Sequence, residues 1–495
     1  MNILKKLEQS MACWFLIFIS FIFFLLRLPS LFEPNWYGDE GIYQVLGLGM
    51  NAGRLLYRDI FDNKPPLLYF LYGLVSSDQF AIRLLSLIAG FLALLSFYYL
   101  SRKILEDKKA SFIATAFFAI LFGLPLIEGN IANAENFMLL PNIVSAILVL
   151  KTLETTDRTK KLVTLFTAGI VIGVSFLFKI VAVFDFGAFL TFIFFANYSN
   201  RFLDNFKLNN LKTEIKNIFP FAFGFLIPIA LVTLIFILKG AFSDFLTAVL
   251  FSNIGYVGYG NKFIIPQGFL IFKLFLLFSF LIFIFVKRKT LGNYFVFSSI
   301  WLAFSIFDAF FSQRPYTHYV LVLLPSLCLF IGFFSLKKSL SRLAGIFLFS
   351  AFILIITNFN FYTKTIFYYQ NFASFILGQK SVYDYQRFFD GNTPNDYEIA
   401  AYLNLRLKEK DNIFIWGNNA QVYTLTNRIS PGKYTVAYHV TSYKDGIKNT
   451  QKGLLLKKPK YIVIMPNVSP FPFVLSDYKN KININGINIY EKISD

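Results

Sequence analysis

The chain has 495 residues, of which 56% are hydrophobic and 15% charged, and phenylalanine alone occurs 65 times. The apolar residues come in blocks of about twenty, the length that crosses a ~30 Å hydrocarbon core, which excludes a set of soluble domains and predicts a polytopic α-helical membrane protein. The net charge of +19 does not indicate nucleic-acid binding, because the basic residues lie in short loops between the apolar blocks.

The basic residues occur in alternate loops, which is the pattern of cytoplasmic loops under the positive-inside rule. We therefore expect a multi-pass protein of the cell (plasma or inner) membrane with its N-terminus inside and everything after Phe359 outside. The basic loops contain Arg102, Lys103, Lys108 and Lys109; Lys151, Arg158, Lys160 and Lys161; Lys207, Lys212 and Lys216; Lys287, Arg288 and Lys289; and Lys337, Lys338 and Arg342.

The first apolar run begins after Lys5 and Lys6 and ends without a small-residue cleavage site, which is typical of a retained first span. Cys13 and Cys328 both lie inside apolar runs, so neither a disulfide framework nor a CxxC metal site is expected.

About eleven membrane helices are predicted from the apolar blocks. The connections on the outer side would be Trp36–Asp78, Glu128–Glu135, Gly240–Gln267 and Ser312–His318. The predicted spans are Met11–Leu31, Gln79–Leu100, Ala110–Ile127, Asn136–Leu150, Leu162–Phe178, Ile180–Ala196, Ile218–Leu238, Phe269–Val286, Tyr294–Phe311, Tyr319–Phe334 and Leu343–Asn358.

From about Lys380 the composition becomes that of a soluble domain. We expect a transmembrane domain at 1–379, with its first outer loop at 32–78, and an extracytoplasmic α/β domain at 380–495. The predicted elements of the latter are a helix from Thr393 to Lys408, a buried strand at Asn412–Gly417, a short helix at Gln421–Thr426, a β-rich run at Tyr461–Met465 and a period-two run at Ile482–Tyr490.

The first outer loop carries adjacent acids, Asp39 and Glu40, at the start of an amphipathic helix. Side chains of adjacent residues point about 100° apart on a helix, so one acid is expected to face a site and the other to pair with a neighbour. The alternative is an N-cap with a salt bridge to Arg54 or Arg58. The apolar stripe formed by Ile42, Val45, Leu46, Gly49 and Met50 would lie in lipid at the interface.

Lys64-Pro65-Pro66 places a cation just before a rigid corner that cannot enter a helix interior. A lysine held at headgroup depth suits a phosphate, and the alternative is an ordinary lysine that contacts lipid headgroups.

Three further groups of ionisable residues are predicted near the outer surface. Glu128 and Glu135 bracket one outer turn, and Glu135 could alternatively be an ordinary helix-start acid. In SQRPYTHYVLVLLP, Arg314, His318 and Tyr319 stand at the outer end of a span, where a lone histidine could equally be structural. Lys179 is either a lysine at a helix end or part of an outward-facing cavity, and His439 has no evident partner.

The segments GDE, LYRDIFDNKPPLLYF, ANAENF and RPYTHYVLVLLP, taken in this order, resemble the GT-C glycosyltransferases. The resemblance is to bacterial members of the protein O-mannosyltransferase and aminoarabinose-transferase group (families 39 and 83). It covers the membrane domain, and IFIWGNNAQVYTLTNR resembles the small C-terminal domain of many such proteins. One departure argues against the aminoarabinose sugar, because Ile42 stands shortly after the acids where those transferases carry an arginine.

The resemblance implies transfer of one sugar from a polyprenyl phosphate to an extracytoplasmic lipid, glycan or protein acceptor. It implies a catalytic, acceptor-activating acid at Asp39 and a second catalytic acid at Glu135. The substrate-binding residues expected from the matching motifs and their surroundings are Glu40, Tyr57, Lys64, Arg314, His318 and Tyr319.

A phosphate monoester leaves without a general acid when cations such as Lys64 and Arg314 stabilise its growing charge, so these two residues are expected to form a phosphate clamp. One carboxylate could then activate the acceptor hydroxyl in a single inverting displacement. No cofactor or metal is required by this chemistry, although related oligosaccharyltransferases use a divalent ion, which stays a minor alternative. The rival interpretations are a multispanning transporter or flippase, which usually carries ionisable groups near the bilayer midplane, and an inactive lipid-binding scaffold.

Overall fold

The computed structural model describes residues 2–197, 208–254, 270–312, 314–336 and 340–493. Lys207, Lys337 and Lys338, which the sequence assigns to basic loops, lie outside these residues, as does part of the predicted outer segment Gly240–Gln267. The chain divides into two compact units. Unit 1 contains Met1–Leu28, Leu85–Ile235 and Ser252–Thr363, and unit 2 contains Pro29–Leu84, Phe236–Phe251 and Lys364–Asp495. The expected division at residues 379 and 380 stays a prediction.

A helix lies at each predicted span, and the protein is a polytopic α-helical membrane protein. Within the described residues, eight helices are long and apolar enough to cross a membrane, so the predicted number of about eleven is not confirmed. The other three (α5, α8 and α13) hold 16, 16 and 17 residues. α14 reaches the required length only together with the 3-10 helix Thr317–Leu323 that precedes it. The bounds are α1 Asn2–Arg27, α4 Gln79–Leu105, α5 Lys108–Gly123, α6 Ala134–Lys151, α7 Arg158–Phe178, α8 Ala182–Asn197, α9 Leu208–Leu238, α12 Leu270–Leu291, α13 Asn293–Ala309, α14 Leu324–Ser335 and α15 Leu340–Asn358.

In unit 1 the helices pack in pairs such as α6 with α7, α5 with α14 and α8 with α13. Small residues permit the closest approach, which is the usual device for packing helices in lipid. A Cβ atom added to Gly169 of α7 would lie 2.1 Å from the carbonyl oxygen of Phe221 in α9. A Cβ atom on Gly224 would lie equally close to the carbonyl oxygen of Phe166.

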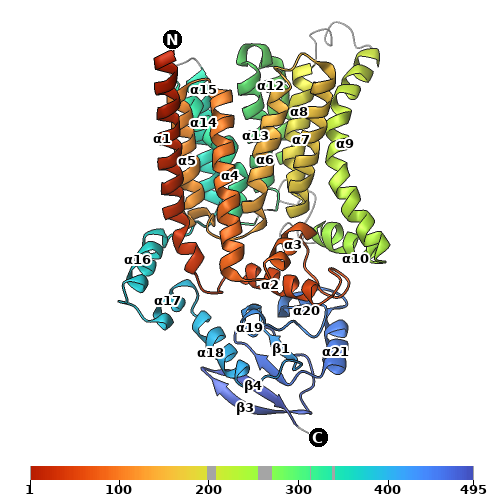
Figure 1. Ribbon diagram of the computed structural model, residues 1–495. Helices are drawn as coiled ribbons and strands as arrows, with labels where there is room; N and C mark the ends of the chain where they lie inside the picture. The colour runs from red at the N-terminus through yellow and green to blue at the C-terminus, as the bar shows by residue number, and fades with distance from the viewer. Residues whose placement is uncertain (1, 198–207, 255–269, 313, 337–339, 494–495) are drawn as a thin grey trace. The chain divides into compact units, whose positions relative to one another are not determined.

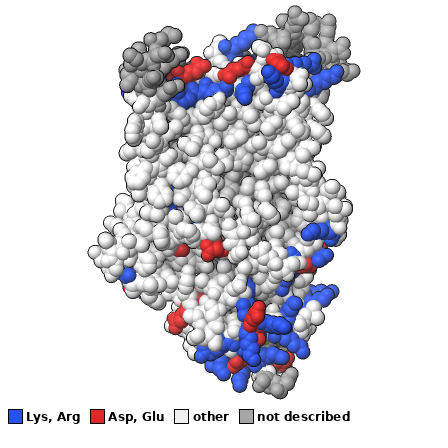
Figure 2. All heavy atoms as spheres, in the orientation of Figure 1, with Lys and Arg blue, Asp and Glu red and all other residues white. Residues whose placement is uncertain are grey.

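The basic loops that the structure describes lie at the end of unit 1 where α1 begins. The α4–α5 and α6–α7 connections are both at that end (Figure 1), and Lys and Arg gather there in a rim beside a face with few charges (Figure 2). Asp107 and Asp157 start α5 and α7 there by accepting hydrogen bonds from backbone N–H groups. The alternation of charge along the sequence therefore corresponds to one end of the unit.

Unit 2 contains the first outer loop, which folds into α2 (Gly38–Asn51) and α3 (Pro66–Leu74). Ile42, Val45 and Leu46 are buried within protein, so the prediction that this stripe lies in lipid is wrong. Residues of α3 and α19 (Gln421–Leu425) pack against α2. The apolar periodicity was evidence of burial, but it does not distinguish a lipid neighbour from a protein one.

The C-terminal part of unit 2 is a small α/β domain, as the composition predicts. Its four-stranded sheet has the order β1-β2-β4-β3, with β1 parallel to β2 and the other pairs antiparallel. The strands are β1 Ile413–Trp416, β2 Tyr461–Ile464, β3 Tyr478–Ile484 and β4 Ile487–Lys492. The α-helices of unit 2 not yet given are α10 Phe242–Leu246, α16 Thr365–Ile376, α17 Val382–Phe389, α18 Thr393–Asn404, α20 Ala437–Ser442 and α21 Gly446–Lys457.

Two predicted elements of this domain need correction. The helix from Thr393 ends at Asn404, and residues 405–408 are not part of it. The period-two run Ile482–Tyr490 is a hairpin and not one strand, because Asn485 and Gly486 have φ values of 50° and 86° and form a two-residue turn. Asn-Gly between alternating residues is the standard signal for such a turn.

Candidate active site

The two acids at the start of α2 point to different partners. The Asp39 side chain is 39% exposed, and its Oδ2 lies 3.6 Å from Lys64 Nζ. The Glu40 side chain is 2% exposed, and its Oε2 accepts a 2.5 Å hydrogen bond from Arg83 Nη2. The expectation that the acids diverge is confirmed, and the ion pairs are with Lys64 and Arg83 and not with the Arg54 or Arg58 of the alternative interpretation.

The Lys64 corner is built by its backbone. Pro65 is extended, with φ −61° and ψ 161°, and Pro66 begins α3 at a position where a missing N–H costs nothing. The Lys64 N–H donates to the Tyr69 hydroxyl at 3.1 Å, and the Lys64 carbonyl accepts from the Tyr57 hydroxyl at 2.7 Å. Both backbone polar groups of this lysine are therefore fixed before any ligand arrives.

The ammonium group of Lys64 is shared by two carboxylates and one ring. Besides Asp39, its Nζ lies 3.8 Å from Asp62 Oδ2 and 4.7 Å from the centre of the Tyr43 ring. The Tyr43 hydroxyl donates to Asp39 Oδ2 at 3.0 Å, and burial, reinforced by the Asp39 charge, raises the pKa of Tyr43 well above its usual value. Tyr43 thus stays protonated and keeps donating to the carboxylate.

Sequence reasoning missed Asp62, which lies two residues before Lys64. Its buried side chain accepts a 2.7 Å hydrogen bond from the Tyr69 hydroxyl. His439 of α20, for which the sequence showed no partner, places Nε2 3.9 Å from Asp62 Oδ1, and burial lowers the pKa of His439. The only signal for Asp62 was its presence in the same short motif as Lys64.

Glu40 and Tyr57, expected to bind substrate, are both buried. Arg83 bridges Glu40 and Glu33, whose Oε2 lies 3.3 Å from Arg83 Nη1. Tyr57 has a φ of 71° and packs its ring against Phe236. In this structure both residues hold α2 and the Lys64 corner in place, and their substrate-binding role stays a prediction.

A second cluster of ionisable groups lies in unit 1. Glu135, in the first turn of α6, forms an ion pair with Lys179 at the end of α7, and both side chains are largely buried. Lys179 Nζ also lies 4.3 Å from the centre of the Tyr319 ring. Lys179 therefore stands at the end of α7 within a buried polar cluster, and the interpretation that it is part of an outward-facing cavity stays a prediction.

His318 links the two acids of this outer turn. Its Nδ1 lies 2.9 Å from Glu128 Oε2 and its Nε2 3.8 Å from Glu135 Oε1. The Thr317 hydroxyl donates to Glu128 Oε1 at 2.6 Å, so Glu128 orients the imidazole and is itself oriented. Arg314, half-buried in the segment before His318, belongs to the same unit. Lys64 belongs to unit 2, so a phosphate clamp made by Arg314 and Lys64 stays a prediction.

The described residues contain no group of three or more His, Cys, Asp or Glu side chains arranged to hold a metal ion. The expectation that the reaction requires no metal or cofactor stays a prediction. Chemically, the unit 2 cluster offers an accessible carboxylate beside a fixed cation, which are the groups that a proton acceptor and an anion site need.

Two family models match parts of the sequence. Residues 63–211 match the model described as dolichyl-phosphate-mannose-protein mannosyltransferase, and residues 394–490 match that of the competence-induced protein Ccs4 C-terminal domain. No curated protein sequence matches the chain.

Solved structures match over almost the whole chain. ArnT from Cupriavidus metallidurans, solved bound to undecaprenyl phosphate, has a TM-score of 0.54 and 14% sequence identity, covering 96% of this chain and 97% of that one. The oligosaccharyltransferase AglB from Archaeoglobus fulgidus has a TM-score of 0.49 and 13% identity, covering 92% of this chain and 69% of that one, and this lower score adds nothing to the assignment. The chain therefore has the GT-C glycosyltransferase fold, and the mannosyltransferase model agrees with this class.

Proposed function

We propose that the chain is an integral membrane glycosyltransferase that moves a single sugar from a polyprenyl phosphate to an extracytoplasmic acceptor. The observation that carries the proposal is the pair formed by Asp39 and Lys64, an accessible carboxylate 3.6 Å from a lysine fixed at a rigid corner. The GT-C fold and the description of the matching mannosyltransferase model support transfer from a lipid-linked donor. The undecaprenyl phosphate bound to the Cupriavidus ArnT supports a polyprenyl carrier.

In the proposed reaction the acceptor hydroxyl attacks the anomeric carbon as the bond from that carbon to the phosphate oxygen breaks. Asp39 accepts the hydroxyl proton, and Tyr43 holds the carboxylate in place through its hydrogen bond. The polyprenyl phosphate leaves as a monoester whose second pKa is about 6, so it departs without a general acid. A single displacement of this kind inverts the anomeric centre.

Lys64 and Arg314 would stabilise the negative charge that grows on the leaving phosphate. Glu135 and His318 would orient the donor or acceptor. Tyr319 belongs to the same cluster, since the centre of its ring lies 4.3 Å from Lys179 Nζ. This chemistry needs no metal or other cofactor, because the cations are supplied by side chains.

We further propose that the protein lies in the plasma or inner membrane with its basic loops in the cytoplasm. The C-terminal domain would then be extracytoplasmic. The GT-C fold and the mannosyltransferase model favour this enzyme over the transporter alternative.

The proposal is tested by mass spectrometry of surface glycans and glycoproteins from cells that lack this gene. We expect one glycoform to disappear and to return when the wild-type chain or the control variant Asp477→Asn is supplied, because Asp477 is an exposed carboxylate in the C-terminal domain. Asp39→Asn should fail to restore it. Restoration by Asp39→Asn would remove Asp39 from the mechanism, and unchanged glycans would remove the function.

A further inference from the structure

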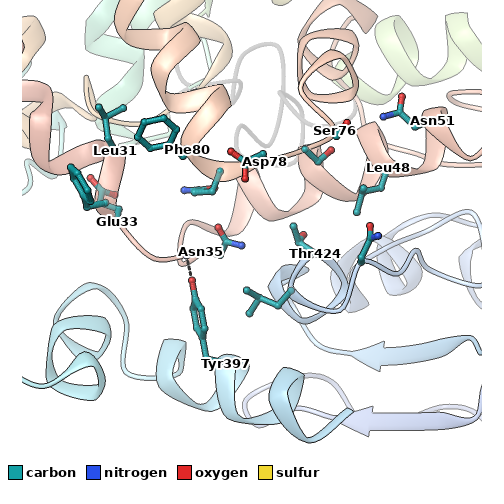
Figure 3. Close-up of a pocket in the computed structure, with 15 residues that line it drawn as sticks. Leu31, Glu33, Asn35, Leu48, Asn51, Ser76, Asp78, Phe80, Tyr397 and Thr424 are labelled. Carbon is teal, nitrogen blue, oxygen red and sulfur yellow. Dashed lines mark hydrogen bonds between the residues drawn. The ribbon is translucent and has the colours of Figure 1, made fainter. Parts of the chain in front are cut away.

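Unit 2 contains a groove of about 780 Å³ to which the proposed reaction assigns neither substrate. It lies among the end of α2, the turn before α4, and the helices α18 and α19 (Figure 3). Ligand sites in proteins typically measure about 300–1,000 Å³, so the groove has the size of a site for a small ligand.

The side chains that line the groove exclude an anionic ligand. None of the 15 lining residues, all within the described part of the chain, is a lysine, arginine or histidine. Asp78 is an exposed acid, whereas the Glu33 carboxylate is buried and paired with Arg83. Phosphate and carboxylate sites rely on cationic donors, which this groove lacks. The lining instead combines amides and hydroxyls with the exposed rings of Phe32 and Phe80.

Two polar side chains of the groove could form hydrogen bonds to a ligand. Within the described residues, the buried Thr424 Oγ1 has no hydrogen-bond partner, a state that costs free energy. A rotation of the Thr424 side chain towards the groove would let a ligand satisfy this hydroxyl. The backbone N–H of Asn35 donates to the Tyr397 hydroxyl at 3.0 Å. The side-chain amide of Asn35 faces the groove, opposite Thr424 (Figure 3).

The backbone of the groove wall is fixed in an unfavourable conformation. Ser76 and Ser77 follow each other with φ values of 52° and 60°, a left-handed region that non-glycine residues seldom occupy. The Ser77 hydroxyl holds this turn by donating to the Gln44 carbonyl at 2.7 Å. Such conformations tend to persist at binding sites, where the surrounding structure compensates for their cost.

We propose that this groove binds a saccharide that carries no anionic group. A pyranose ring offers hydroxyls that both donate and accept, as amide and hydroxyl side chains do, and a C–H face that packs on aromatic rings. An anionic sugar would be repelled by the exposed Asp78 carboxylate with no cation in the lining to offset it, whereas an uncharged or amino sugar would not be repelled. The proposed reaction does not identify its acceptor, and we infer that the bound saccharide is part of that acceptor. In this one respect the inference rests on the proposed function.

Gln79 connects the groove to the candidate active site. It lines the groove, and its Nε2 lies 3.4 Å from Glu40 Oε2, beside Asp39 at the start of α2. A saccharide held in the groove would therefore contact the same residues that fix the N-terminal end of α2.

The test measures binding of trisaccharides to the purified full chain in lipid nanodiscs by saturation-transfer NMR and competition. The probes are maltotriose, cellotriose and mannotriose as neutral sugars, a glucosamine trimer as the amino sugar, and a galacturonic acid trimer as the anionic one. We expect at least one neutral or amino trisaccharide to bind and the anionic one to bind at least tenfold more weakly.

Thr424→Val and Asn35→Leu should each weaken that binding about three- to tenfold, the effect of one lost hydrogen bond. Thr441→Val, which alters an exposed threonine of α20, should leave it unchanged. Asp39→Asn should also bind normally, so a failure of the proposed reaction would not be mistaken for a failure of the groove. Absence of binding to every probe, preference for the anionic trimer, or full binding by both groove variants would overturn the inference.

Discussion

Asp62 accepts a hydrogen bond of 2.7 Å from the hydroxyl of Tyr69, and that same hydroxyl accepts one from the backbone N–H of Lys64. The buried carboxylate thus fixes the corner that carries the candidate phosphate-binding lysine. We infer that Asp62 is a positioning residue that acts through Lys64.

Asp62→Ala should lower sugar transfer about tenfold, the effect of roughly 1.4 kcal/mol, because the corner loses the acceptor that fixes it. Asp62→Asn should recover most of the rate, since an amide oxygen can still accept from Tyr69. The measurement is the transfer rate in membranes at several donor concentrations. Equal losses in the two variants would mean that the charge of Asp62 itself takes part in the reaction.

The pair formed by Glu135 and Lys179 makes a separate prediction for unit 1. Lys179→Met leaves Glu135 as a buried uncompensated carboxylate, which typically costs about 3–5 kcal/mol, so little folded protein is expected. The double variant Glu135→Gln with Lys179→Met should restore the folded amount measured by size-exclusion chromatography. It should remain inactive, and full activity would show that Glu135 is structural.

Arg83 should be the most sensitive position of unit 2 for stability. Its side chain is fully buried between Glu33 and Glu40, so Arg83→Met leaves two buried carboxylates without their cation. We expect a loss of about 3–5 kcal/mol or more in the free energy of unfolding, as for other broken buried pairs. Arg58→Met is the matched control, because its pair with Asp59 is exposed and should contribute little. Equal thermal stability of the two variants would contradict this account.

The sequence located part of this site for an identifiable reason. Asp39 and Lys64 lie in one connection between apolar blocks. Ionisable residues are conspicuous there, and the short connection limits how far apart their side chains can lie. The pairs of Glu33 with Arg83 and of Asp62 with His439 join residues 50 and 377 positions apart by sequence number, and no periodicity encodes such contacts. The α2 stripe indicated burial correctly, but its neighbour is protein and not lipid. The turn at Asn485-Gly486 did carry its own signal, which the period-two pattern around it obscured.

The C-terminal domain should become less stable as the pH rises. Burial, with a smaller effect from Asp390, raises the pKa of Asp396 from its ordinary value of 3.8 to about 8. Between these two values the folded state binds a proton that the unfolded state has released, so stability falls with rising pH, by at most about 1.4 kcal/mol per pH unit.

This pH dependence can be measured by hydrogen exchange of strands β1 and β2 in the full chain between pH 5 and 8, after correction for the intrinsic exchange rate. Protection should fall as the pH rises, and Asp396→Asn should flatten the profile. An equally steep profile in that variant would assign the effect to another group.

The account depends most on the claim that Lys64 and Asp39 meet the phosphate end of a polyprenyl carrier. The direct measurement is the affinity of the purified chain for undecaprenyl phosphate. Lys64→Met should bind about 10- to 100-fold more weakly, as expected for a lost charged hydrogen bond, whereas the exposed control Lys479→Met should bind normally. Asp39→Asn should bind at least as tightly as the wild type, because it removes a negative charge close to that of the phosphate. Wild-type affinity in Lys64→Met would contradict the central claim.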